Sequence, residues 1–197
     1  MSYAIIGLGK IGTAIAQAFA QQGIEVIVAG RRAVDTLAAQ IGASLVPKPI
    51  EDAVKADVVI LAVPFAAHRD IGRMADNWQG KIVIDATNAF GVPPEELDGL
   101  PSTAAVAKAF PGAKVVKAFN HVGAATLAQG PTTPAGGRRV VFVASDDDAA
   151  SASVAALTER LGFAPIELGK IGEGGLLVQA RGRTWGRLIF QDLVKFD

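Results

Sequence analysis

The sequence predicts a doubly wound α/β fold, in which a mostly parallel sheet carries helices on both faces and ends in a short C-terminal α/β extension. Three observations lead to this prediction. Short apolar segments bounded by glycine, proline or aspartate alternate with longer segments of helical period, as in parallel sheets covered on both faces. A glycine-rich turn separates the first apolar segment from the first helical one. Half of the 197 residues are hydrophobic and 19% are charged, which suffices for one buried core.

The expected strands are short and rich in valine and isoleucine, residues that favour a pleated sheet. They cover residues 3–7, 24–30, 43–46, 56–63, 81–87, 113–119, 138–145 and 163–168. Helices are expected over residues 11–19, 34–41, 64–78 and 102–110. The first has apolar residues at helical spacing and ends near Gly23, which suits a left-handed C-cap. Ser102 is expected to cap the fourth helix, and the acidic run 146–148 to cap a further one.

Composition excludes several classes of function. The formal net charge is zero, which offers no long-range attraction to nucleic acid or to an anionic membrane. The chain has no cysteine, so disulfides, thiolate metal sites and a cysteine nucleophile are excluded, and no metal is expected. Met1 leads almost directly into the first strand, without a targeting segment or a membrane-spanning run. We therefore expect a soluble, cytoplasmic protein without nucleic-acid or membrane partners.

The turn GLGKIG spans residues 7–12 and has the form of a dinucleotide-binding motif. Gly7 allows a tight turn, Gly9 lets the backbone approach a pyrophosphate, and Gly12 lets the helix pack closely on the strand. The phosphates would then lie at the positive end of the helix dipole. Because the turn follows the first strand and opens a periodic helix, it predicts a Rossmann-type site rather than a purely structural turn.

The end of the second strand indicates which dinucleotide is bound. An NAD site has an acidic residue there that accepts hydrogen bonds from the adenosine ribose. This chain has Gly30 followed by Arg31 and Arg32. Arginine makes forked, charge-assisted hydrogen bonds to phosphate. We therefore expect the pair to bind the 2′-phosphate of NADP rather than to be merely solvated residues before a helix.

Five motifs in order, GLGKIG, AGRR, VVILAVP, VIDATN and KVVKAFN, resemble the NADP-binding reductases related to the deazaflavin-dependent NADP oxidoreductases and to the reductase domain of the STEAP metalloreductases. The resemblance extends from Tyr3 to about Leu168. It implies that NADPH exchanges a hydride with a deazaflavin or flavin ring. Carried over by residue, the expected cofactor-binding positions are Gly7, Leu8, Gly9, Lys10, Ile11, Gly12, Arg31, Arg32, Ala62, Val63, Pro64, Thr87 and Asn88. Many relatives have a serine where Gly30 stands, so one hydroxyl contact to the 2′-phosphate is missing here.

Hydride transfer between two rings depends on orientation and needs no side-chain acid or base. His121 and Asn120, which follow the sixth strand, are the candidate acceptor-positioning residues, although His121 is equally consistent with a surface loop. We expect His68 to be structural, and Lys114 and Lys117 to be strand-edge or structural residues.

Residues 130–137, GPTTPAGG, mark the expected seam between a dinucleotide-binding domain (1–137) and an extension (138–197), which together form one compact unit. The extension would complete the sheet and contribute to the acceptor pocket or to a homodimer interface. Gly182 and Gly186 would form a helical notch beside Trp185 for this contact, and a simple capping helix on the core is equally consistent with this segment.

Two other functions remain open. Imine and hydroxyacid reductases share the N-terminal motifs, but they carry a further helical domain for which we expect this chain to be too short. A module that senses NADP(H) without turnover is the other alternative.

Overall fold

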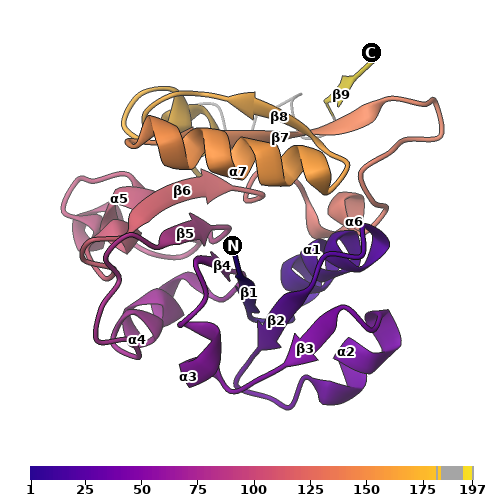
Figure 1. Cartoon of the computed structure of the whole chain (residues 1–197). Helices are drawn as coiled ribbons and strands as arrows, with labels where there is room; N and C mark the ends of the chain where they lie inside the picture. Colours follow the sequence, from indigo (N-terminus) through magenta and orange to yellow (C-terminus); the bar gives the residue numbers. More distant parts are fainter. Residues whose placement is uncertain (181, 183–192, 197) are drawn as a thin grey trace.

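A computed structural model describes residues 1–180, 182 and 193–196, and the predicted notch residues Gly186 and Trp185 lie outside this part. Within it, nine strands form one sheet in the order β3-β2-β1-β4-β5-β6-β7-β8, and β9 pairs with β7 (Figure 1). The strands are β1 (Tyr3–Ile6), β2 (Val26–Ala29), β3 (Leu45–Pro47), β4 (Val58–Leu61), β5 (Ile82–Asp85), β6 (Lys114–Ala118), β7 (Arg138–Ser145), β8 (Ala164–Glu167) and β9 (Val194–Lys195).

Strands β1 to β6 are parallel, in the order of a dinucleotide-binding sheet, so the predicted fold class is confirmed. Strand β7 then joins β6 in the antiparallel direction, and β8 pairs parallel with β7. Segment 130–137 precedes β7, and the strands after it extend the same sheet.

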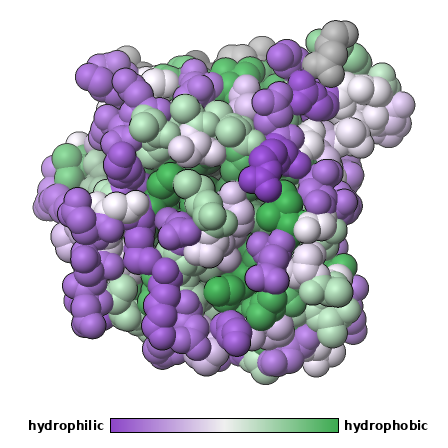
Figure 2. All heavy atoms as spheres, in the orientation of Figure 1, coloured by the Kyte–Doolittle hydropathy of each residue, from purple (hydrophilic) through white to green (hydrophobic). Residues whose placement is uncertain are grey.

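Helices cover both faces of the sheet (Figure 1). The α-helices are α1 (Lys10–Gln21), α2 (Asp35–Ile41), α3 (Ile50–Ala53), α4 (His68–Gly72), α5 (Ser102–Ala107), α6 (Ala124–Leu127) and α7 (Asp148–Arg160). Three 3₁₀ turns accompany them, namely η1 (Phe65–Ala67), η2 (Pro94–Leu97) and η3 (Gly174–Val178). On the face shown in Figure 2, hydrophobic residues lie scattered between hydrophilic ones rather than in one broad patch.

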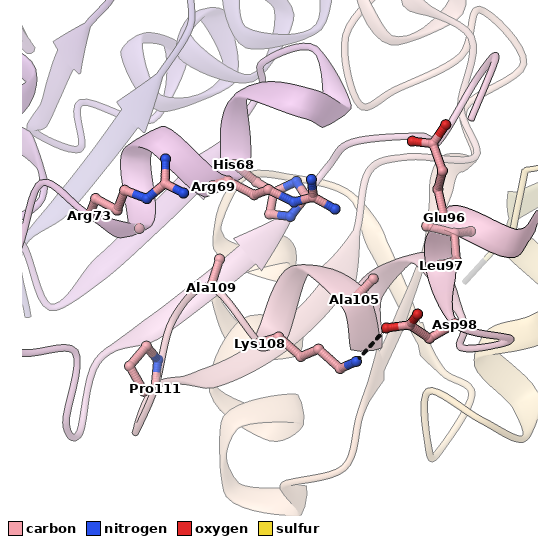
Figure 3. A pocket seen from close by; sticks show the side chains of 11 residues that line it. His68, Arg69, Arg73, Glu96, Leu97, Asp98, Ala105, Lys108, Ala109 and Pro111 are labelled. Carbon is pink, nitrogen blue, oxygen red and sulfur yellow. Dashed lines mark hydrogen bonds and ion pairs between the residues drawn. The ribbon is translucent and has the colours of Figure 1, made fainter. Parts of the chain in front are cut away.

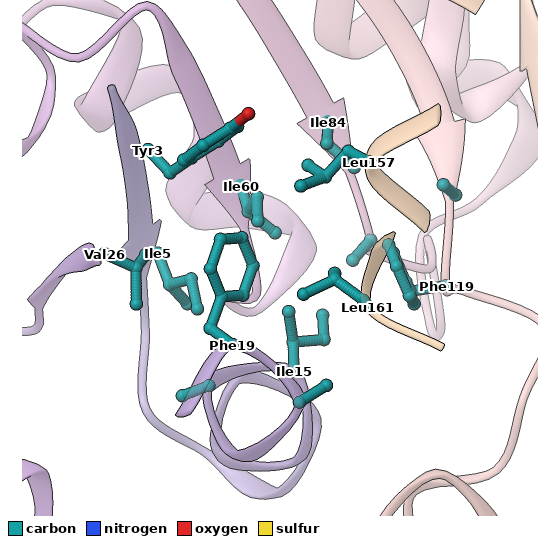
Figure 4. Packing of buried hydrophobic residues seen from close by; sticks show 14 of the residues in the cluster. Tyr3, Ile5, Ile15, Phe19, Val26, Ile60, Ile84, Phe119, Leu157 and Leu161 are labelled. Carbon is teal, nitrogen blue, oxygen red and sulfur yellow. The ribbon is translucent and has the colours of Figure 1, made fainter. Parts of the chain in front are cut away.

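The two faces follow from the alternation of side chains along each strand. Ile5, Ile60 and Ile84 point to the face covered by α1, α6 and α7, where Phe19 packs edge-on against Tyr3 with ring centroids 5.5 Å apart (Figure 4). Their strand neighbours point to the opposite face, which α3, α4 and α5 cover. Both faces are buried, which explains why the strands are apolar throughout rather than alternating.

Three expectations about helix ends had different outcomes. Asp147 caps α7 as predicted, because its carboxylate accepts a hydrogen bond of 2.8 Å from the Ala150 amide. Ser102 is not the cap of α5: the cap position falls on Pro101, and the Ser102 amide donates instead to the side chain of Gln179. The helix expected over residues 64–78 was too long, since it is one 3₁₀ turn followed by α4, whose last carbonyl, that of Gly72, accepts the Trp78 indole N–H.

Candidate functional site

The glycine-rich turn joins β1 to α1, and its glycines serve different purposes. Gly7 has a positive φ of 99°, and a Cβ there would lie 2.5 Å from the Ala62 carbonyl oxygen. A Cβ on Gly12 would lie 1.8 Å from the carbonyl oxygen of Gly7. Both positions therefore need glycine for the fold itself. A Cβ on Gly9 would meet nothing within 4 Å, so the fold does not need glycine here and the space beside its backbone is open.

Helix α1 begins beside this space with no cap from a side chain and no acidic residue in its first turn. Its first residue is the exposed Lys10. A cation at the positive end of a helix is unfavourable in isolation, because it faces the dipole and the free amides. An anion bound at this end would reverse that effect, since it would interact favourably with the amides, the dipole and Lys10 together.

A cleft of about 610 Å³ runs along the carboxyl ends of β1, β2 and β4. The topology places β1 between the other two strands, which brings three predicted segments to one opening. Of the predicted cofactor positions, the cleft is lined by Gly7, Leu8, Gly9, Arg31, Arg32, Ala62, Val63 and Pro64. Lys10, Ile11, Gly12, Thr87 and Asn88 do not line it.

Arg31 and Arg32 are exposed at the β2 end of the cleft. In the part of the chain that the structure describes, neither arginine forms an ion pair with a carboxylate. Gly30 stands where a ribose-binding acid would be needed for NAD. This end of the cleft therefore attracts a phosphate and does not repel it.

Asn88 and Asn120 meet at the ends of β5 and β6. The Asn88 Nδ2 donates to the Asn120 carbonyl at 2.8 Å, and the Asn120 Nδ2 donates to the Asn88 side-chain oxygen at 3.1 Å. The Asn120 Nδ2 also donates to the Val178 carbonyl in η3 at 2.7 Å. The Asn120 Oδ1 is buried and has no hydrogen-bond partner among the residues that the structure describes. Three segments that are far apart in the sequence thus converge here.

A buried ion pair lies under this junction, between Asp85 of β5 and Lys117 of β6. Their charged atoms are 3.3 Å apart, and neither side chain is more than 2% exposed. Thr103 donates to Asp85 at 2.6 Å and accepts from Lys117 at 2.8 Å. Thr87 donates to Asp85 from both its hydroxyl and its amide. The hydroxyl of Thr87 therefore points into the protein, which fixes the backbone that carries Asn88.

Two opposing effects act on the pKa of Asp85. Burial is the largest influence and raises it, but the Lys117 ammonium and the hydrogen bonds from Thr103 and Thr87 together hold it below its ordinary value. The carboxylate is therefore charged at neutral pH. Lys117 is structural, as the sequence predicted, but it is interior rather than at a strand edge. An isolated lysine in an apolar strand gave no sign of which acid it would meet.

Both histidines are buried. The ring of His121 is 1% exposed, packs 4.8 Å from the ring of Phe142, and has no hydrogen bond of ordinary geometry on either nitrogen. Burial lowers its pKa to about 4, while the backbone of Val140 opposes this shift. The surface-loop interpretation of His121 is therefore wrong, and its ring offers no surface to an acceptor in this conformation. His68 has the predicted structural placement, with its Nδ1 against the Phe65 carbonyl.

A second hollow of about 450 Å³ lies between α4 and α5 (Figure 3). Its charged lining is partly paired, since Lys108 bonds Asp98 at 3.0 Å and Arg73 bonds Asp70 at 3.1 Å. None of the residues predicted for the cofactor lines this hollow, so the 610 Å³ cleft is the candidate site. Among the described helices, none is long and apolar enough to cross a membrane.

Comparisons with known proteins agree with this geometry. The family described as NADP oxidoreductase, coenzyme F420-dependent, matches residues 2–89, which include the glycine-rich turn, the arginine pair and Asn88. Rat (Rattus norvegicus) metalloreductase STEAP3 is 31% identical over 85% of this chain. Human (Homo sapiens) metalloreductase STEAP2 is 30% identical over 61% of it. The chain spans only 33% and 24%, respectively, of the length of these two curated relatives.

Solved structures extend the similarity to most of the chain. A hypothetical protein from Sinorhizobium meliloti is 40% identical, with a TM-score of 0.90 and coverage of 100% of this chain and 96% of that one. A protein from Arthrobacter sp. FB24, provisionally assigned as an F420-dependent NADP-reductase, is 31% identical, with a TM-score of 0.69 and coverage of 87% and 86%. A reductive aminase from Aspergillus terreus, in complex with NADPH, is 25% identical, with a TM-score of 0.65 and coverage of 89% and 57%.

Proposed function

The chain belongs to the family of coenzyme F420-dependent NADP oxidoreductases, and on that premise we propose that it exchanges a hydride between NADP(H) and a deazaflavin, flavin or similar planar acceptor. The observation that carries the proposal is the cleft that joins the open Gly9 position to Arg31 and Arg32, which have no ion pair within the described part of the chain. The pyrophosphate and the 2′-phosphate of NADP are attached to the 5′ and 2′ oxygens of one adenosine ribose, so they need these two features within one cleft.

The residues present fit this dinucleotide. The backbone at Gly9 and the uncapped start of α1 would hold the pyrophosphate, because no Cβ and no capping side chain occupy that space. Arg31 and Arg32 would bind the 2′-phosphate. Ala62, Val63 and Pro64 continue the cleft along β4 and would border the nicotinamide half. When bound, NADPH supplies the hydride.

The acceptor side would be formed by the segments that Asn88 and Asn120 join. Phe90, Leu176 and Leu177 are apolar but 58%, 42% and 43% exposed, and they belong to these same segments. Apolar side chains beside a fixed pair of amides suit a planar ring with polar edges, since the ring face can pack while the edge is hydrogen-bonded. The half-buried Asn88, held in place by the buried Asn120, would orient the acceptor, and the apolar groups would exclude water, without a side chain that moves a proton.

Imine reduction is the second candidate, favoured by the likeness to the reductive aminase. The two reactions make different demands on the protein, because reducing an imine to an amine needs a proton as well as a hydride. Of the two buried histidines, His121 has a depressed pKa that makes it a poor proton donor at neutral pH. The burial of His121, which keeps it uncharged at neutral pH, therefore favours the planar-acceptor reaction.

The test mixes NADPH-loaded protein with one acceptor at a time under single-turnover conditions and follows the loss of the NADPH absorbance. Flavin mononucleotide, a deazaflavin and a cyclic imine are the three acceptors. Oxidation by a flavin or deazaflavin is the expected result. Turnover with the imine alone would establish the second candidate, whereas tight NADPH binding without oxidation by any acceptor would indicate a sensing module.

A further inference from the structure

A smaller pocket of about 310 Å³ adjoins the cleft at its arginine end. Gly30, Arg31, Arg32, Ala33, Val34 and Asp35 line one side of it. The other side is lined by Pro47, Lys48 and Pro49, which follow the next strand of the sheet. Gly30 and the arginines line both hollows, so the two hollows lie side by side. Unlike Gly30, Arg31 and Arg32, Lys48 belongs to none of the five sequence motifs.

The sheet register places Lys48 beside the end of β2. Val28 lies opposite Pro47 in the parallel pairing, and the Lys48 amide donates to the Val28 carbonyl at 3.1 Å. Lys48 is therefore level with Ala29, one residue before Gly30. The prolines on both sides restrict the backbone, because Pro49 disfavours helical conformations at the residue that precedes it. The backbone of Lys48 is thus held in position before any ligand binds.

The charges around this pocket are unbalanced. Arg31, Arg32 and Lys48 are cationic, and Asp35 is the acidic residue in the lining. Lys48 is exposed and forms no ion pair among the described residues. Two acids follow it in α3, Glu51 and Asp52; Asp52 bonds to Lys55 at 2.6 Å and interacts with Lys48 only at longer range. Three cations, two of them adjacent and the third from a neighbouring strand, thus face a small open volume.

We propose that Lys48 is a third ligand of the NADP 2′-phosphate and a determinant of the preference for NADPH over NADH. This inference rests on the proposed function, since it deepens the description of the same site. A phosphomonoester carries a charge of about −1.5 to −2 at neutral pH, which a third cation would help to neutralise. Gly30 has no side chain to offer at the strand end, and the ammonium of Lys48 would provide the contact that is missing there. A lysine suits this role because it acts as a mobile point charge beside the fixed arginine forks.

The experiment measures the affinities of NADPH and NADH by titration calorimetry for the wild type, Lys48→Met and Lys55→Met. Methionine retains most of the apolar stem and removes the charge. Lys55 is the matched control, because it belongs to the same β3–β4 connection, its loss changes the net charge equally, and it lines neither hollow. We expect Lys48→Met to weaken NADPH binding about tenfold, as for the loss of one charge-assisted contact, and to leave NADH binding unchanged.

Lys48→Arg should keep most of the affinity for NADPH, since it keeps the charge. Unchanged NADPH affinity in Lys48→Met would overturn the inference and leave the proposed function standing. The same holds if Lys48→Met weakens both cofactors equally, or if Lys55→Met weakens NADPH as much. A wild-type protein that binds neither cofactor would overturn the proposed function as well.

Discussion

Replacing Gly9 by alanine separates binding from folding more cleanly than any other change in the glycine-rich turn. The added Cβ would meet no protein atom within 4 Å, and the φ of −75° at this position is accessible to alanine. As a change at a helix N-cap it should cost at most about 1 kcal/mol of folding free energy, or roughly 2–4 °C in Tm. The same methyl group would project into the space proposed for the pyrophosphate.

The loss of binding can be estimated from the backbone contacts. A hydrogen bond to a charged group contributes about 1.5–3 kcal/mol, so displacing the phosphate from one amide lowers affinity by about tenfold to 150-fold. Calorimetry with NADPH measures this loss, and thermal unfolding of the same preparation shows that the variant is folded. NADH should lose the same factor, because both cofactors share the pyrophosphate.

Gly12→Ala provides the contrast. Its Cβ would lie 1.8 Å from a backbone carbonyl oxygen, so the helix must shift and Tm should fall by more than in Gly9→Ala. If folded Gly9→Ala binds NADPH with wild-type affinity, the open space at this position does not hold the pyrophosphate, and the assignment of the cleft is refuted.

Four further predictions follow from the charges. NADPH should bind at least about tenfold tighter than NADH, as calorimetry would show, and replacing Arg31 and Arg32 by methionine should reduce the difference to what Lys48 alone supplies; equal wild-type affinities would contradict the NADP assignment. Lys117→Met should lower the free energy of unfolding by about 3–5 kcal/mol in denaturant titrations, because it leaves Asp85 charged and buried. The depressed pKa of Asp85 implies stability that is present above its unfolded-state pKa of about 3.9 and is lost as pH falls through its lower folded-state pKa. Asp85→Asn should therefore change how the free energy of unfolding depends on pH at acid pH, and an unchanged dependence would be inconsistent with the ion pair. His121 has a pKa of about 4 in the folded protein and about 6.5 when unfolded, so stability should fall by roughly 3 kcal/mol between these pH values on acidification, and His121→Phe should remove that slope.

The features that the sequence predicted are those with a local signal. Gly7, Gly9 and Gly12 are contiguous with the strand and helix that they join, so their spacing carries the geometry of the turn. The arginine pair could be interpreted because it comes directly after strand β2, and β2 follows the glycine-rich turn at a regular distance in the sequence. The fold class followed from apolar strands and periodic helices, since each depends on residues close together in the chain.

The features that the sequence missed depend on pairing between distant strands. Lys48 comes to line a pocket with the arginines through the register of β3 on β2, which no short motif encodes. Asp85 and Lys117 meet because β5 and β6 are neighbours in exact register, as the alignment of these two residues across the sheet shows. His121 lies close to Phe142, a residue of β7, and the short sequence around it does not show this contact. A polar Asn-His pair after a strand predicts a surface loop, and that rule failed where a later strand packs against the loop.

Phe119 connects the proposed acceptor side of the site to the hydrophobic core. Its φ of 61° lies in the left-handed region, which bulky residues seldom adopt and which costs on the order of 1–3 kcal/mol. Glycine would avoid this cost but would lose the ring, which is fully buried and packs edge-on against Phe163 with centroids 5.9 Å apart. The turn at Phe119 directs the next residue, Asn120, toward Asn88 and toward η3. The strain is thus offset by core packing from the segment that leads into β8, so the C-terminal half of the chain sets the position of Asn120, whose amide holds Asn88 in place.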